Sequence, residues 1–196
     1  MSYSRDVPLI QDYVRKKGPD GLVDVGSFVL CTVQVPLSRV GPMIQDIRVS
    51  GAESKHLWGF KRRAFEEITQ RKVELYNLLE KPSESVSEVL SEVSRVFGLG
   101  LPKASFLMQC MGWNTACLDV HNLKRMSIPI GLTKVGKVGE DTRKKKIDRY
   151  VEIVQSEGSE TLWNDWCSHI AGNRWNQNLP TADAVSAYHV ECIING

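Results

Sequence analysis

The chain has 196 residues, of which 42 % are hydrophobic and 24 % are charged, and its formal net charge is +2. These values are ordinary for one globular domain, or for one body of two small lobes, and they exclude a disordered or repeat protein. No apolar run is long enough to span a bilayer and the first six residues lack the pattern of a secretion signal, so we expect no membrane partner and a cytoplasmic location.

The first half of the chain predicts helices. Residues 27–33 are rich in β-branched side chains but have no partner strand nearby, so we interpret them as a buried helix. Residues 53–79 predict one long helix or two joined helices. Residues 84–97 predict an amphipathic helix with Ser83 as its N-cap and Gly98 as its stop. The buried face of that helix would consist of Val86, Val89, Leu90, Val93 and Phe97.

The second half continues this pattern after a loop predicted at residues 127–142. Apolar side chains at helical spacing predict helices over residues 140–157, 160–171 and 182–194. Their boundaries are marked by capping and stopping residues, which are Ser159, Gly172 and Thr181. We therefore expect an all-α protein of roughly eight to ten helices.

The cysteines do not suggest a metal site. They are odd in number and widely spaced, which is typical of reduced thiols in a cytosolic protein. They are Cys31, Cys110, Cys117, Cys167 and Cys192. No four of them lie close enough in the sequence to predict a zinc site or an iron–sulfur centre, so we expect neither a metal nor a cofactor.

Positive charge is concentrated in one segment. Residues 124–149 hold nine basic and three acidic side chains, a net +6, whereas residues 150–196 have a net −5. The basic residues are Lys124, Arg125, Lys134, Lys137, Arg143, Lys144, Lys145, Lys146 and Arg149. Such a patch on a nearly neutral protein is typical of a surface that contacts nucleic-acid phosphates; the alternative is a solvated loop and helix start.

Two helices are joined by a short turn around Gly98 and Gly100. Glycines there let backbone N–H groups approach an anion closely, and the second helix points its positive N-terminus the same way. The turn therefore predicts a helix-hairpin-helix that holds DNA phosphates. Lys103 lies in the first turn of the second helix, where the helix dipole disfavours its charged form. Asp119 lies on the other flank of that helix, so we expect both side chains to face one pocket.

The segments Gly-Leu-Gly-Leu-Pro-Lys-Ala at 98–104 and Leu-Asp-Val-His at 118–121 resemble the signature of the helix-hairpin-helix DNA glycosylase superfamily. Residues 28–37 are similar to an early helix of that family, which ends near its DNA cleft. The resemblance covers about residues 22–126 and implies a two-lobed, glycosylase-like domain. Residues 22–126 would form the hairpin and active-site lobe, and residues 127–196 the basic loop and C-terminal helices.

The resemblance implies site residues and a partner. Lys103 matches the amine nucleophile of bifunctional members and Asp119 matches their essential carboxylate. The enzyme would act as a monomer on double-stranded DNA and would flip a base from the stack before cleaving its glycosidic bond. The DNA contacts expected from the resemblance and the charge pattern are Gly98, Gly100, Gln34, His121, Asn122, Lys124, Arg125, Lys144 and Lys145.

Each of these residues has a structural alternative. Lys103 could contact a phosphate or solvent, and Asp119 could serve as the N-cap of a helix at 121–126. His121 could be structural, and Gln34 could bond locally. Three tryptophans could stack on a flipped base, although helical spacing favours core packing for the first two. They are Trp163, Trp166 and Trp175, and we interpret His169 and His189 as structural.

Three functions are consistent with the sequence. The first is a glycosylase, with Schiff-base lyase chemistry through Lys103. The second follows from a shift of the glycines by one residue relative to Lys103, which makes the segment similar to a phage branch that modifies thymine. Such an enzyme would transfer an amine or amino acid onto activated 5-hydroxymethyluracil in DNA, within the host cytoplasm. The third is a non-catalytic DNA-binding module that needs Gly98 and Gly100 but neither Lys103 nor Asp119.

Overall fold

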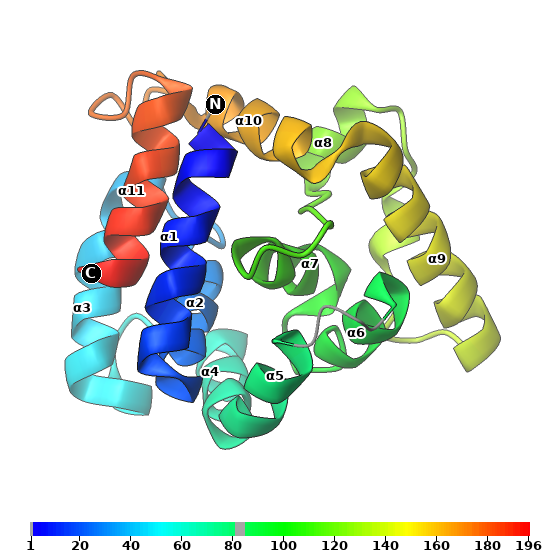
Figure 1. Cartoon of the computed structure of the whole chain (residues 1–196), viewed down its shortest axis with the longest axis horizontal. Coiled ribbons are helices and arrows are strands. Elements are labelled where there is room, and N and C mark those ends of the chain that lie inside the picture. Colours follow the sequence, from blue (N-terminus) through cyan, green and yellow to red (C-terminus); the bar gives the residue numbers. More distant parts are fainter. Residues whose placement is uncertain (1, 81–84) are drawn as a thin grey trace.

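The computed structural model describes residues 2–80 and 85–196. These residues form eleven α-helices and three short 3₁₀ helices and contain no strand (Figure 1). The expected all-α class is therefore confirmed, and the number of α-helices is slightly higher than predicted. Within the described ranges, no helix combines the length and the apolar character needed to cross a membrane.

The N-terminal helices enclose a largely apolar helix, α2. Their bounds are α1 (Ser2–Lys17), α2 (Pro19–Cys31), η1 (Leu37–Arg39) and α3 (Val40–Ser50). Phe28, Val29 and Leu30 of α2 are fully buried, which confirms the interpretation of residues 27–33 as a buried helix up to Cys31. Their β-branched neighbours pack between α1, α3 and the following helices because every face of α2 has a partner.

The segment predicted as helix over residues 53–79 begins later than expected. The 3₁₀ helix η2 (Gly51–Glu53) ends at its first residue, and its later part forms α4 (Phe60–Gln70) and α5 (Lys72–Leu79), so the two-helix alternative holds there. Residues 54–59 are not helical. Gly59 has a φ of 58°, a left-handed conformation that interrupts a helix, and α4 starts directly after it.

The hairpin consists of α6 (Val86–Val93) and α7 (Gly100–Cys110). The predicted N-cap Ser83 lies outside the described residues. The first helix ends earlier than the predicted residue 97, and the chain turns over residues 94–99. The expectation that Phe97 is buried is wrong: its ring is 37 % exposed and lies 4.1 Å from the Arg63 guanidinium.

The C-terminal part follows the predicted boundaries closely. It contains α8 (Val120–Arg125), η3 (Ile130–Thr133), α9 (Glu140–Glu157), α10 (Ser159–Ile170) and α11 (Ala182–Ile194). Thr181 caps α11, since its hydroxyl accepts a hydrogen bond from the Ala184 N–H at 3.2 Å. Ser159 lies inside the first turn of α10 and Gly158 occupies the N-cap position, so the predicted cap is displaced by one residue.

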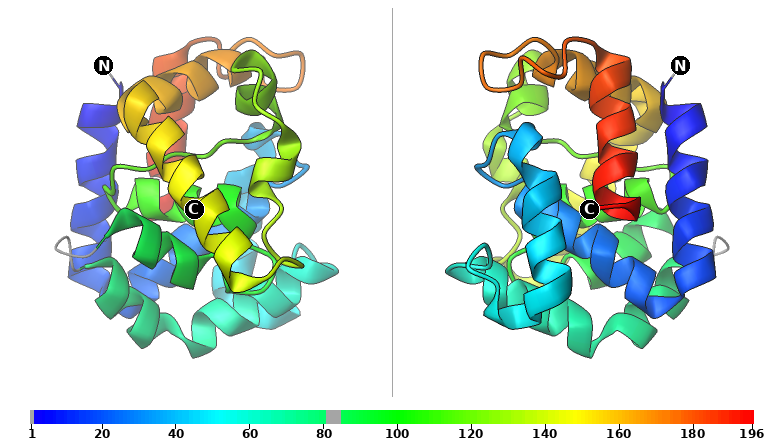
Figure 2. Two further views of the ribbon diagram at one scale, coloured as in Figure 1. Left: turned by 90° about the vertical axis from the view of Figure 1, so that its right-hand side faces the viewer. Right: turned by 90° about the vertical axis from the view of Figure 1, so that its left-hand side faces the viewer.

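The helices are not arranged in chain order. The last helix, α11, packs against α1 and α3, whereas α9 packs against α6 and α10. Figure 2 shows α9 on one side of the molecule and α3 with α11 on the opposite side. Helices from both sides of residue 126 thus pack together, and the division into two lobes at that point stays a prediction. Helix α7 lies near the centre and carries much of the site described next.

Candidate active site

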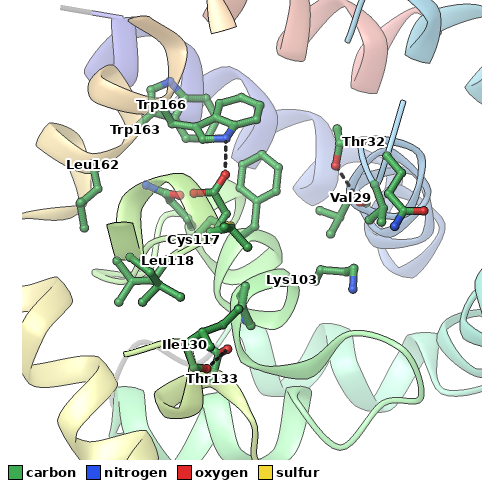
Figure 3. Close-up of a pocket in the computed structure, with 18 residues that line it drawn as sticks. Val29, Thr32, Lys103, Cys117, Leu118, Ile130, Thr133, Leu162, Trp163 and Trp166 are labelled. Carbon is green, nitrogen blue, oxygen red and sulfur yellow. Dashed lines mark hydrogen bonds between the residues drawn. The ribbon is translucent and has the colours of Figure 1, made fainter. Parts of the chain in front are cut away.

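A cavity of about 430 Å³ lies beside the N-terminal half of α7 (Figure 3). Segments far apart in the sequence form its walls: the end of α2, α7, residues 117–123, the loop around η3 and α10. Gln34, Lys103 and Asp119 all line it. The structure therefore brings the two predicted catalytic side chains to one cavity, although among the described residues no ion pair joins them.

The Asp119 carboxylate is held by two N–H donors. Oδ1 accepts a hydrogen bond from the Asn122 backbone N–H at 2.9 Å, which makes Asp119 the N-cap of α8. Oδ2 accepts one from the Trp166 indole at 3.2 Å, marked by a dashed line in Figure 3. The capping alternative is thus confirmed, and capping leaves the carboxylate at the cavity wall. Trp166 was not foreseen as its partner because only the fold brings α10 to α8.

The Lys103 ammonium lies in a partly buried position on α7. Its Nζ donates to the Gly98 carbonyl at 3.0 Å and lies 5.2 Å from the centre of the Phe60 ring. Burial lowers the pKa of Lys103 because the charged form loses hydration. Figure 3 shows that Lys103 and Trp166 reach the cavity from different sides.

A second lysine, Lys61, lies close to this side of the cavity and was not predicted. It is fully buried, and its Nζ donates to the Val33 carbonyl at 3.0 Å. Burial lowers the pKa of Lys61, and the positive charge of Lys103 lowers it further. The sequence contained a signal for it: Lys61 occupies the apolar face of α4 together with Ala64, Phe65 and Ile68.

Cys117 also lines the cavity, and its thiol interacts electrostatically with both predicted catalytic residues. Burial strongly raises the pKa of its thiol, and the negative charge of Asp119 raises it further, whereas Lys103 opposes the shift. Cys117 therefore stays a protonated, weakly reactive thiol at neutral pH.

One wall of the cavity is aromatic. Phe106, Trp163 and Trp166 line it. The centroid of the Phe106 ring lies 5.9 Å from that of Trp163 and 5.7 Å from that of Trp166. Trp163 is 2 % exposed, which confirms the core packing expected of it. Behind this wall lies His189, which is fully buried, and among the described residues neither of its ring nitrogens has a hydrogen-bond partner. Burial lowers the pKa of His189 to about 3.

Three of the predicted site residues have a positive φ. Gly98 and Gly100 have φ values of 78° and 56°, so the turn requires glycine at both positions. A Cβ on Gly98 would lie 2.8 Å from the Phe60 ring, so the missing side chain makes room for Phe60. Gln34 has a φ of 58°, which is rare for a residue other than glycine.

The basic segment is divided between different surfaces. A groove of about 810 Å³ joins Gly98 and Gly100 to Lys134, Lys137 and Lys146. Arg143 does not belong to the exposed charge predicted for this segment. It is buried, and its guanidinium donates to the Ser91 carbonyl and the Ser94 hydroxyl.

Other predicted contacts lie away from the glycine turn. Lys144 lines a separate cavity between α6 and α9, and the neighbouring Lys145 is exposed. The structure therefore does not bring Lys144 together with the glycine turn. Lys124 is exposed on α8, and the Arg125 guanidinium pairs with the Asp165 carboxylate at 3.0 Å.

The two predicted contacts beside Asp119 differ in accessibility. The His121 ring stacks on His169, with ring centroids 3.4 Å apart. Burial lowers the pKa of His121, and the neighbouring His169 lowers it further. Asn122 is fully buried and donates to the Cys117 carbonyl at 2.9 Å. The expectation that Asn122 reaches a ligand is therefore wrong, because its side chain supports the turn before α8.

The chain was compared with protein families, curated proteins and solved structures. No family model, curated protein or solved structure matches it.

Proposed function

We propose that the protein acts on a base in double-stranded DNA, flips its nucleotide into the 430 Å³ cavity and cleaves the N-glycosidic bond. One observation carries this proposal: an amine of lowered pKa, Lys103, and an oriented carboxylate, Asp119, line one cavity beside a glycine turn. The cavity volume lies in the range usual for small-molecule sites. The two-lobed, helix-hairpin-helix glycosylase-like fold is part of the same proposal.

The surroundings of the cavity suit a flipped base. Phe106 and Trp166 offer flat apolar surface on one wall, on which a base can pack. Gly98 and Gly100 line the groove that also contains Lys134 and Lys137. Helix α7 begins at Gly100, so its N-terminus lies at this turn. Backbone N–H groups and lysines there would hold phosphates without regard to sequence.

Asp119 would act on the sugar. As the base leaves, C1′ gains positive charge, and a carboxylate fixed by two N–H donors stabilises that charge without first having to reorient. Such a preorganised group typically lowers the barrier by about 3–4 kcal/mol.

Lys103 would form the covalent bond. Its neutral Nζ attacks C1′, the C1′–N bond breaks, and the electron pair of that bond leaves with the base, which takes up a proton. The attached nitrogen then loses a proton, the C1′–O4′ bond breaks with its electron pair on O4′, and O4′ takes up a proton, which leaves a protonated Schiff base between Nζ and C1′. The lowered pKa supports this role because only the neutral amine is nucleophilic.

Borohydride trapping tests the proposal. The protein is mixed with duplexes that contain uracil, hydroxymethyluracil, an oxidised purine or an abasic site, and the mixture is reduced. We expect a covalent adduct with at least one duplex, absent in Lys103→Ala and Lys103→Arg. Base release that depends on Asp119 but gives no adduct would support glycosylase activity and contradict lyase chemistry through Lys103.

DNA binding with neither adduct nor base release in any duplex would contradict a glycosylase and leave two alternatives, a non-catalytic module and an enzyme of amine transfer. If the protein is the non-catalytic module, Lys103→Ala and Asp119→Asn would bind DNA like the unaltered protein. The absence of any DNA binding would contradict the whole proposal.

One observation favours amine transfer as the second candidate. The Lys103 nitrogen already donates to the Gly98 carbonyl and has no ion pair with Asp119 in the described part of the chain. In this reading Asp119 takes a proton from an incoming amine, which displaces the activated group on 5-hydroxymethyluracil. Incorporation of a labelled amino acid into phosphorylated hydroxymethyluracil DNA, lost in Asp119→Asn but retained in Lys103→Arg, would distinguish it.

A further inference from the structure

A second groove, of about 500 Å³, adjoins the candidate active site. The two share Thr32, Gln34 and Trp166 as lining residues, so they meet along the end of α2 and one side of α10. The far side of the second groove is formed by the segment after α10, which includes Asn173 and Trp175. No residue of this groove takes part in the chemistry proposed above except through the shared wall.

Trp175 is an exposed aromatic ring on a fixed backbone. Its side chain is 59 % exposed, yet its backbone N–H donates to the Asn173 side chain at 3.2 Å and its carbonyl accepts from the Ser38 hydroxyl at 3.1 Å. The buried Asn176 side chain accepts from the Ser38 N–H and ties the same segment to η1. The backbone therefore holds the indole in place, and more than half of the side chain stays exposed, which suits a platform for a planar ligand.

The polar groups of the groove match a nucleotide. The amides of Gln34 and Asn173 offer both donors and acceptors, as base edges require. Arg39 supplies a positive charge at the same groove, and the Arg174 guanidinium lies 4.5 Å from the Trp175 ring centre. One aromatic platform, neutral amides and cations together are the usual means of holding a base and its phosphate.

Gln34 connects the two grooves through an unusual backbone. Its φ of 58° is unfavourable for a residue with a Cβ, and it lies where both cavities share a wall. Such conformations occur most often at functional sites, where surrounding contacts maintain them.

We propose that the second groove binds a second, unpaired nucleobase, stacked on Trp175, while the flipped base occupies the main cavity. The inference depends on the proposed function, because flipping one nucleotide leaves its former neighbours without stacking or pairing partners. The occupant comes from the partner strand, as the base left behind, or from the same strand, as the neighbour of the flipped nucleotide. Both sources present the same chemistry, and the experiment distinguishes them.

The experiment measures the Kd of the full chain for three duplexes by fluorescence anisotropy. Each contains a tetrahydrofuran abasic analogue at the target position. The first is otherwise complete, the second lacks the base opposite the target, and the third lacks the adjacent base on the target strand. The variants are Trp175→Ala, Trp175→Phe and, as a matched control, Trp58→Ala, which removes a comparably exposed indole outside both grooves.

We expect Trp175→Ala to weaken binding of the complete duplex roughly tenfold, in the range for stacking on one ring, and Trp175→Phe to retain most of the affinity. On the duplex that lacks the contacted base, Trp175→Ala should have no effect, which identifies the source of the base. Trp58→Ala should bind all three like the unaltered protein.

Equal weakening of all three duplexes by Trp175→Ala, or no weakening of any, would overturn the inference while base release through Lys103 and Asp119 still stands. If the unaltered protein binds none of the duplexes, the proposed function fails and this inference fails with it.

Discussion

The two charged groups of the main cavity are held in opposite ways. Asp119 is fixed by directional hydrogen bonds from α8 and α10, and each carboxylate oxygen has an N–H donor. Lys103 is instead partly desolvated, with one carbonyl and one aromatic ring near its ammonium and a second buried lysine close by. Geometry therefore controls the carboxylate, and burial controls the amine. The two sides should respond to different perturbations.

The largest expected effect is on the carboxylate side. Asp119→Asn removes the negative charge but keeps a good helix N-cap, so stability should change little. Base release should fall on the order of 100- to 1,000-fold, as when a group that stabilises transition-state charge is lost. Single-turnover kinetics measures this. Asp119→Ala, which also removes the cap, should in addition lower the free energy of unfolding by about 1 kcal/mol; equal activity in both variants and the unaltered protein would exclude Asp119 from the chemistry.

The aromatic wall behind the carboxylate side should be acid-sensitive through His189. The pKa of this histidine is lowered to about 3, so as pH falls below its ordinary value the unfolded chain is protonated first. Stability present above pH 6.5 is then lost progressively down to about pH 3, with about 2 kcal/mol lost between pH 7 and pH 5. Urea unfolding across this range should show a shallower pH dependence in His189→Phe. An unchanged slope would contradict the assignment.

A smaller effect tests the hydrogen bond that joins α10 to the site. Trp166→Phe keeps an aromatic ring but removes the indole N–H that donates to Asp119. A hydrogen bond to a charged group contributes about 1.5–3 kcal/mol, so kcat for base release should fall roughly tenfold while KM changes little. A rise in KM with unchanged kcat would instead show that Trp166 binds the base and does not orient the carboxylate.

The smallest effect should appear on the amine side. Lys61→Met removes a neighbouring positive charge, and like charges disfavour the charged form of Lys103. The pKa of Lys103 should rise, so the pH dependence of borohydride trapping should move upward by a fraction of a pH unit. Lys55→Met, which removes an exposed lysine, is the control. A downward shift, or the same shift in both variants, would contradict the proposed role of Lys61.

Much of the fold could be predicted because its signals are local. Helical periodicity located α9, α10 and α11 to within about a residue, and Thr181 and Asp119 were recognised as possible caps. The errors occurred where tertiary contacts override the pattern. Phe97 fits an apolar helix face, but the chain turns before it and its ring lies against Arg63 near the surface.

The candidate site was predicted only as far as the sequence motif extends. Lys103 and Asp119 lie on the two flanks of one short helix, so local structure brings them to one cavity. Trp166, which lines this cavity, and Lys61, which lies near it, come from helices distant in the sequence, and only the fold brings them close to Asp119 and Lys103. Formal charge was also misleading for Arg143, because a basic residue counts equally whether it faces solvent or fills a buried position.

The contact between α1 and α11 has a consequence for biosynthesis. The chain emerges from the ribosome at about 5–20 residues per second, so α1 is complete on the order of ten seconds before α11 exists. During this interval the apolar face of α1 that α11 later covers, and the side of α3 beside it, have no permanent partner. Closure of this part of the core is therefore delayed, and the nascent protein is most exposed to chaperones and proteases during the seconds before α11 emerges.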